Sequence, residues 1–144
     1  MPLQPIPSVN EDTAAFWEGG ATGQLMIHRC RTCRAWFHPP APVCAECLSL
    51  DVGPEAASGK ATVVAYSVNY QPWAPDMVVP YVIGYVLLDD AAPVQLTTRF
   101  VDVAPEDMAV GMPVEVVFEQ HEDIYLQLFR PVAASGTTTT KDQA

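Results

Sequence analysis

The four cysteines of the sequence form two Cys-x-x-Cys pairs, Cys30 with Cys33 and Cys44 with Cys47, which are separated by ten residues. A Cys-x-x-Cys turn lets two sulfurs approach one metal ion, so two such turns can supply the tetrahedron of thiolates that zinc accepts. The separation is shorter than the roughly 15–20 residues of one common zinc-finger pattern, but it suffices for a ribbon of two facing hairpins. We therefore predict that all four cysteines bind one zinc ion. Disulfides or a redox pair are the alternatives, although a thioredoxin-like pair would need a βαβ setting that this sequence lacks.

A closed shell of four thiolates leaves no open position for an activated water, so the predicted zinc is structural. Arg29, Arg31 and Arg34 lie next to the first pair and could offset the negative charge of the thiolates. They could also hold an anionic ligand or partner, and both interpretations stay open. His28 and His38 flank the cysteine pairs, but with four thiolates available we expect them to lie at the surface or pack in the ribbon.

The charge balance argues against a nucleic-acid partner. The chain has 144 residues, of which 17 are acidic and 7 are Lys or Arg, so its formal net charge is −10. Affinity for a phosphate backbone depends on basic side chains, and between Ala35 and Thr98 Lys60 is the only Lys or Arg. Only 17% of the residues are charged and 49% are hydrophobic, a composition that fits a surface partly covered by a partner.

No membrane association is expected. The longest apolar run, Pro80–Leu88, is far shorter than the roughly 20 residues of a membrane-spanning helix. The first residues combine neither a basic nor an apolar region of the kind that makes a signal peptide. We therefore expect a cytoplasmic protein, because a reducing compartment keeps cysteines available as metal ligands.

The order of the predicted elements indicates a mainly β fold. Residues 1–24 should form an arm followed by a short helix over Glu11–Gly19 that is capped by Asn10, and residues 25–57 the zinc ribbon, with Pro54–Gly59 as a linker. Residues 58–132 contain five strand-like runs with a helical turn over Pro105–Gly111 after the third, which is the element order of a five-stranded OB-fold barrel. The runs are Lys60–Tyr70, Tyr81–Asp89, Val94–Phe100, Val114–His121 and Ile124–Arg130. Residues 133–144 read as a disordered tail.

No catalytic constellation is evident. The sequence lacks the motifs of nucleophile elbows, phosphate-binding loops and dinucleotide-binding turns. Its acidic pairs fall at predicted turns, and His121 falls at the predicted hairpin that joins the last two strands, so we assign no catalytic residue. Tyr66 with Tyr70 and Tyr81 with Tyr85 share strand faces, and we expect them in the barrel core rather than in a base-stacking platform.

Several stretches together resemble the acyl-CoA-associated zinc-ribbon/OB-fold family, formerly a domain of unknown function. They are Cys30–Cys33, Pro39–Pro40, Cys44–Cys47, Ser58–Val63, Pro80–Asp89, Gly111–Val116 and Phe129–Pro131. The resemblance implies an N-terminal helix, a rubredoxin-like zinc ribbon and a C-terminal OB-fold. Only the four cysteines are carried over as site residues.

The resemblance also implies an accessory subunit bound to a thiolase-superfamily enzyme. In steroid-degrading bacteria similar domains pair with an aldolase that cleaves a CoA-thioester side chain, and in archaea they bridge a thiolase and another CoA enzyme. A CoA thioester would then lie at a subunit interface. A stand-alone acyl-CoA-binding or carrier protein is the alternative. Aromatic residues are candidate anchors for a partner, or core residues: Trp17, Trp36, Phe37 and Trp73.

Overall fold

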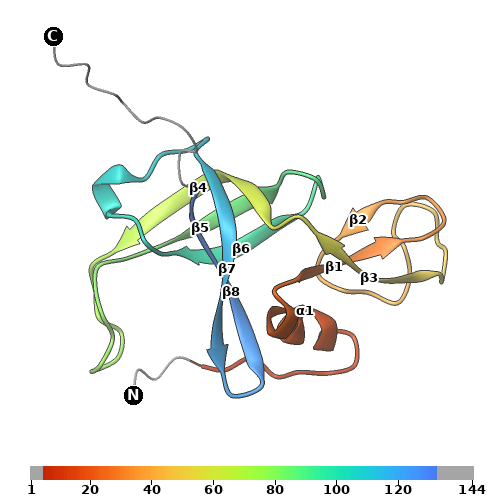
Figure 1. Cartoon of the computed structure of the whole chain (residues 1–144), viewed down its shortest axis with the longest axis horizontal. Coiled ribbons are helices and arrows are strands. Elements are labelled where there is room, and N and C mark those ends of the chain that lie inside the picture. Colours follow the sequence, from red (N-terminus) through yellow and green to blue (C-terminus); the bar gives the residue numbers. More distant parts are fainter. Residues whose placement is uncertain (1–4, 133–144) are drawn as a thin grey trace, which may run out of the picture.

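The computed structural model describes residues 5–132, so the first four residues of the predicted arm and the predicted tail over 133–144 lie outside it. The chain begins with a short helix, continues through a small three-stranded sheet and ends in a closed barrel (Figure 1). The mainly β fold class and the order of its parts are as predicted.

The N-terminal helix is shorter than predicted. Asn10 and Thr13 cap each other, because the Thr13 backbone N–H donates to Asn10 Oδ1 at 3.0 Å and the Asn10 N–H donates to Thr13 Oγ1 at 3.1 Å. Residues 11–13 therefore form a turn, and α1 spans only Ala14–Glu18. Gly19, the expected end of the helix, instead begins the 3-10 helix η1 (Gly19–Thr22), which ends at the left-handed Gly23.

The small sheet contains β2 (Trp36–Phe37), β1 (Leu25–Cys30) and β3 (Val52–Ala57) in that order. The prediction of a linker starting at Pro54 is wrong, because β3 pairs with β1 along its whole length, from Leu25 opposite Ala57 to Cys30 opposite Val52. Pro54 fits because β3 is an edge strand, where the missing N–H can face away from the sheet. The connection to the barrel is thereby reduced to Ser58 and Gly59.

The barrel closes in the order β4-β5-β6-β8-β7. Its strands are β4 (Lys60–Asn69), β5 (Tyr81–Leu88), β6 (Gln95–Phe100), β7 (Pro113–His121) and β8 (Ile124–Pro131). The predicted helical turn is present as η2 (Pro105–Asp107) between β6 and β7. Closure depends on the parallel pairing of β6 with β8, where Phe100 lies opposite Phe129. The five-stranded barrel predicted from the run of strands is confirmed.

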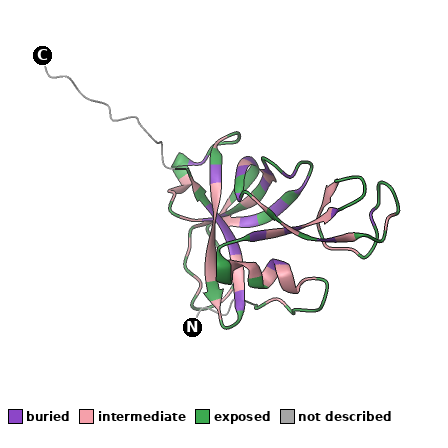
Figure 2. Ribbon diagram, turned by 45° about the vertical axis from the view of Figure 1, so that its right-hand side comes forward, coloured by how far each residue is buried: buried purple, intermediate pink, exposed green. Residues whose placement is uncertain are grey.

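One hydrophobic core joins the helix, the ribbon and the barrel, and Figure 2 shows buried residues in all three parts. Phe129 is fully buried in the barrel, and Leu25 and Ile27 from β1 belong to the same buried cluster as Phe16 from α1. Buried Gln127 on β8 donates from Nε2 to the Phe16 carbonyl oxygen at 2.6 Å. The N-terminal half is thus packed against the barrel rather than tethered to it.

The prediction that the tyrosines fill the barrel core is wrong. Val82 and Val86 occupy the inner face of β5, so the alternation of the strand turns Tyr81 and Tyr85 outward. Tyr85 is 50% exposed, and Tyr70, which follows the end of β4, is 70% exposed. Tyr66 is also exposed, although its hydroxyl donates to the Met108 carbonyl oxygen at 3.1 Å.

Gly84 is required because the paired strands β4 and β5 approach each other closely at this position. It lies opposite Tyr66, and a Cβ at this position would lie 2.0 Å from the Ala65 carbonyl oxygen. Because backbone cannot move aside as a flexible side chain can, we expect Gly84→Ala to lower the free energy of unfolding by about 1–3 kcal/mol. Urea unfolding of the purified chain measures this, with the exposed Ser67→Ala on β4 as the control. Equal stability of the two variants would contradict the close approach.

Candidate metal centre

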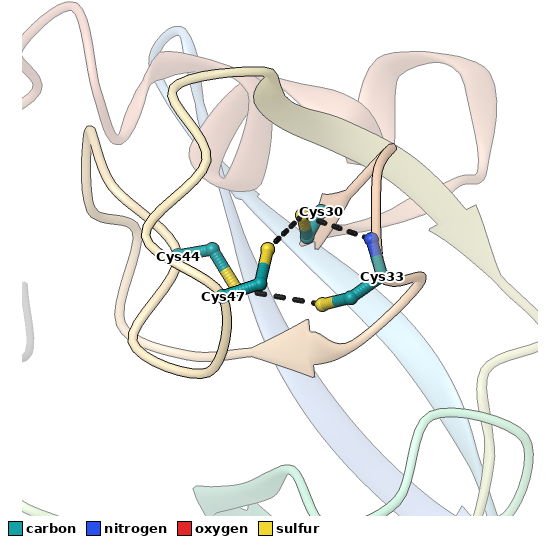
Figure 3. Close-up of side chains that lie close together, drawn as sticks. All are labelled: Cys30, Cys33, Cys44 and Cys47. Atoms are coloured by element: carbon teal, nitrogen blue, oxygen red, sulfur yellow. Dashed lines mark hydrogen bonds between the residues drawn. The ribbon is translucent and has the colours of Figure 1, made fainter.

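The sulfurs of all four cysteines converge between the two turns of the ribbon (Figure 3). Cys30 ends β1 and Cys33 lies in the turn that follows, while Cys44 and Cys47 belong to the loop between β2 and β3. The four Sγ atoms lie within 4.8 Å of one another, and both Cys30–Cys47 and Cys33–Cys44 are 3.6 Å apart. A tetrahedron with Zn–S bonds of about 2.3 Å would place its sulfurs about 3.8 Å apart. The cluster therefore fits one zinc ion, and its four cysteines are not joined as disulfides.

Local backbone geometry shapes both cysteine turns. The Cys33 N–H donates to Cys30 Sγ at 3.4 Å, which closes the first turn around the sulfur. Each turn is followed by a residue in the left-handed conformation, Arg34 with φ 66° and Leu48 with φ 63°. Glycine is the usual residue in this conformation. Because neither position is a glycine, the sequence did not indicate that the backbone turns left-handed after each cysteine pair.

The metal-free thiols differ in acidity. The backbone N–H of Cys33 is the largest cause that lowers the pKa of Cys30, to about 6. For Cys33 the backbone N–H of Ala35 lowers the pKa, but burial and the hydrogen bonds with the other three thiols outweigh it and raise the pKa to about 12. A metal binds all four cysteines as thiolates, so Cys33, whose pKa is raised, must lose its proton when a metal binds. Such proton release makes metal affinity fall as the pH is lowered.

The arginines beside the cysteines are engaged by acidic side chains of the ribbon itself. Arg29 Nη1 lies 3.0 Å and Arg34 Nη2 lies 3.4 Å from Glu55 Oε1. Arg31 Nη1 lies 3.1 Å from Asp51 Oδ1. These carboxylates come from β3 and the residue before it, so the arginines hold the edge strand against the cysteine turns. Surface ion pairs of this kind add little stability individually.

The two flanking histidines pack against aromatic rings. His28 meets Phe37 with ring centroids 5.6 Å apart, and His38 meets Phe16 at 4.8 Å. Within residues 5–132, the cluster of potential metal ligands consists of the four cysteines alone. Both histidines therefore pack within the protein, as predicted, and do not join the cysteine cluster.

Burial of His38 gives the ribbon a pH dependence. Desolvation, with a smaller contribution from His28, lowers the pKa of His38 below its usual value, and its Nδ1 is buried with no hydrogen-bond partner among residues 5–132. Protonation therefore favours the unfolded chain, so this stability is complete above about pH 6.5 and is lost as the pH falls toward the folded-state pKa. We expect the free energy of unfolding to fall less between pH 7 and pH 5 in His38→Phe, which keeps a ring against Phe16. Urea unfolding at pH 7 and at pH 5 measures this difference. An equal fall in the free energy of unfolding in the native chain and in His38→Phe would contradict the role of His38.

The remaining candidate residues lie in turns or at strand ends. His121 sits at the β7–β8 hairpin with its Nε2 2.6 Å from Glu119 Oε1, and Arg99 Nη2 lies 3.1 Å from the other oxygen of the same carboxylate. Asp89 accepts a hydrogen bond from Thr62 Oγ1 at 2.9 Å. Asp89 lies in the bend after β5, as predicted, whereas His121 is the last residue of β7. No helix among the described residues is long and apolar enough to span a membrane.

Two family models match successive parts of the chain. Residues 17–53 match the rubredoxin-like zinc ribbon domain of ChsH2, and residues 54–119 match the C-terminal OB-fold domain of ChsH2. A solved structure of the "Ltp2-ChsH2(DUF35) aldolase" contains a chain that is 34% identical to this one. The two superpose with a TM-score of 0.78 over 88% of this chain and 98% of that chain.

Two curated relatives carry different descriptions. The "3-oxo-4,17-pregnadiene-20-carboxyl-CoA hydratase alpha subunit" of Mycobacterium tuberculosis is 32% identical over 125 residues, which are 87% of this chain and 39% of that protein. A "DUF35 domain-containing scaffold protein" of Methanocaldococcus jannaschii is 35% identical over 94 residues, which are 64% of this chain and 65% of that protein. The chain thus spans less than two thirds of the length of either relative. With the sulfur cluster, the barrel and both family models in agreement, this chain belongs to the DUF35 family, in its ChsH2-type form of a zinc ribbon followed by an OB-fold.

Proposed function

We propose that this chain is a non-catalytic accessory subunit that binds and supports a thiolase-superfamily acyl-CoA enzyme. The observation that carries the proposal is the likeness, at 34% identity and a TM-score of 0.78, to nearly the whole of a chain in the Ltp2-ChsH2 aldolase structure. The archaeal relative described as a scaffold protein points the same way. An OB-fold with a structural metal supplies a rigid body for such a role.

The reaction that we propose for the complex is cleavage of the side chain of a steroid CoA thioester. Support comes from the matched structure, which is that of an aldolase, and from the steroid CoA thioester in the name of the mycobacterial relative. In this proposal the thiolase-superfamily subunit breaks the carbon–carbon bond. This chain holds that subunit in its working form.

We further propose that Cys30, Cys33, Cys44 and Cys47 hold one structural zinc ion. The sulfur separations of 3.6 Å support it. A four-thiolate zinc supplies folding energy to a ribbon rather than an activated water. Thiolate ligands also suit a reducing compartment, which agrees with a cytoplasmic location.

Any CoA thioester is proposed to lie between the subunits rather than on this chain alone. The basic residues of the ribbon support this, because Arg29, Arg31 and Arg34 each face a carboxylate of the same chain. Phosphate groups of CoA would have to compete with those carboxylates. Calorimetry of this chain alone with a CoA thioester distinguishes the two possibilities. A stand-alone carrier would bind the thioester tightly without a partner, whereas a site between subunits would not form.

The functional test is an assay of retro-aldol cleavage of a steroid side-chain CoA thioester. An Ltp2-type subunit, this chain and their mixture are compared at equal protein concentrations. The proposal predicts cleavage by the mixture, little by the Ltp2-type subunit alone and none by this chain alone. Cleavage by this chain in the absence of any other protein would overturn the non-catalytic role.

A further inference from the structure

A set of large apolar side chains is exposed at the end of the barrel that lies away from the ribbon. Tyr70, Trp73 and Val78 in the loop between β4 and β5 are 70%, 74% and 82% exposed. Ile83 and Tyr85 continue the set along the outer face of β5. We call these five residues the distal surface, because in Figure 1 the β4–β5 loop and the ribbon lie at opposite ends of the long axis.

A groove adjoins the distal surface and gives it a concave part. Its volume is about 340 Å³, and it is bounded by the base of the β4–β5 loop, the end of β6 and the start of η2. Its lining is mostly apolar and includes Val78, Tyr81, Phe100, Val101 and Val103. Tyr81 shares the outer face of β5 with Ile83 and Tyr85, since side chains two residues apart lie on the same side of a strand. Loop, groove and strand therefore form one continuous apolar area.

Prolines and two hydrogen bonds restrict the conformation of the loop. It contains Pro72, Pro75 and Pro80, each of which limits backbone freedom. Asn69 stabilises the loop from the end of β4, because its Nδ2 donates to the Gln71 carbonyl oxygen at 2.7 Å and its Oδ1 accepts from Trp73 Nε1 at 3.3 Å. A loop whose conformation is restricted loses less entropy when it binds. Trp and Tyr are also the residue types that most often dominate binding energy at interfaces.

The edge of this apolar area is acidic. Asp76 lies in the loop, Asp102 lines the groove, and Glu106 and Asp107 belong to η2 beside it, and all four are exposed. The one basic residue in the groove lining, Arg99, is paired with Glu119. Complementary charge steers partners together and selects among them, so the matching face of a partner should carry basic residues around an apolar centre.

We propose that the distal surface is the docking site for the thiolase-superfamily subunit, which covers Trp73 and the groove with an apolar patch that has a basic edge. This inference rests on the proposed accessory function and adds which surface of the chain contacts the partner subunit. The ribbon also exposes Leu48 and Leu50. Neither of them lines the groove, so the ribbon provides a matched control at the other end of the molecule.

The test measures binding of full-length variants to an Ltp2-type subunit by surface plasmon resonance. The variant Trp73→Ser/Val78→Ser should bind about 30-fold more weakly or worse, as expected for loss of interface hot spots. The control Leu48→Ser/Leu50→Ser should bind within about threefold of the native chain. All four positions are exposed, so both variants should match the native chain in urea unfolding.

Hydrogen exchange of the native complex gives an independent readout that needs no variant. Residues 70–85 should gain protection on complex formation, whereas residues 43–50 should not. Protection of the ribbon alone, a loss of binding in the ribbon control, or unchanged binding of the distal variant would each overturn the docking site. Failure of the native chain to bind would instead refute the proposed function itself.

The acidic edge can be tested separately. The variant Asp76→Asn/Glu106→Gln/Asp107→Asn should slow association several-fold at low salt, and the difference should vanish at high salt because salt screens exposed charges. Faster association of this variant at low salt would overturn the basic edge assigned to the partner.

Discussion

Replacing Cys44 with serine is expected to abolish stoichiometric zinc binding and to unfold the cysteine turns while the barrel stays folded. Cys44 is fully buried, and its sulfur lies 3.6 Å from that of Cys33. Structural zinc in zinc-finger peptides contributes roughly 10–16 kcal/mol of binding free energy that is coupled to folding. Residues 31–50 contain only the short strand β2, so little else holds them in place when the metal is lost.

The measurement combines metal analysis with hydrogen exchange. The native chain should contain one zinc per chain, and Cys44→Ser should contain far less and lose protection across residues 30–50. Glu46→Gln, an exposed change within the same turn, is the matched control and should keep both zinc and protection. Full zinc occupancy in Cys44→Ser would show that Cys44 is not a ligand.

Truncating Phe129 should produce the largest loss of stability in the barrel. Phe129 is fully buried and lies opposite Phe100 at the parallel pairing of β6 with β8, which closes the barrel. Phe129→Ala removes its ring from the core and leaves a cavity, at a cost of about 3–5 kcal/mol. Because Gln127 on the same strand holds the Phe16 carbonyl oxygen, the helix should also lose protection.

Urea unfolding of the isolated chain measures this effect. Tyr85→Ala removes a ring of similar size from the outer face of β5, where half of the residue is exposed. It should change the free energy of unfolding by no more than about 0.5 kcal/mol in the absence of a partner. Similar losses in the two variants would contradict the assignment of inner and outer faces.

The sequence was informative wherever local chemistry determines structure. The spacing of Cys30, Cys33, Cys44 and Cys47 predicts converging sulfurs, because each pair is brought together by a single turn and a metal needs all four. The five strands were recognisable from their β-branched and aromatic residues. These features depend on neighbours in the chain or on a repeated pattern.

Other features depended on contacts that no local pattern records. Val52–Ala57 contains few residues that favour strands, and it forms β3 only because β1 offers it a full set of backbone partners. The tyrosines were misplaced because a spacing of four residues shows that two side chains share a face but not which face is buried. The bond from Gln127 to the Phe16 carbonyl joins residues 111 positions apart, and nothing in the sequence near either residue indicates it.

Co-expression of a tagged copy of this chain with an Ltp2-type thiolase-superfamily subunit, followed by native mass spectrometry, tests the central claim most directly. The account predicts one stable complex that contains both proteins and one zinc ion for each copy of this chain. A tagged chain that purifies alone as a stable monomer, beside an active and separately soluble thiolase-superfamily subunit, would contradict it.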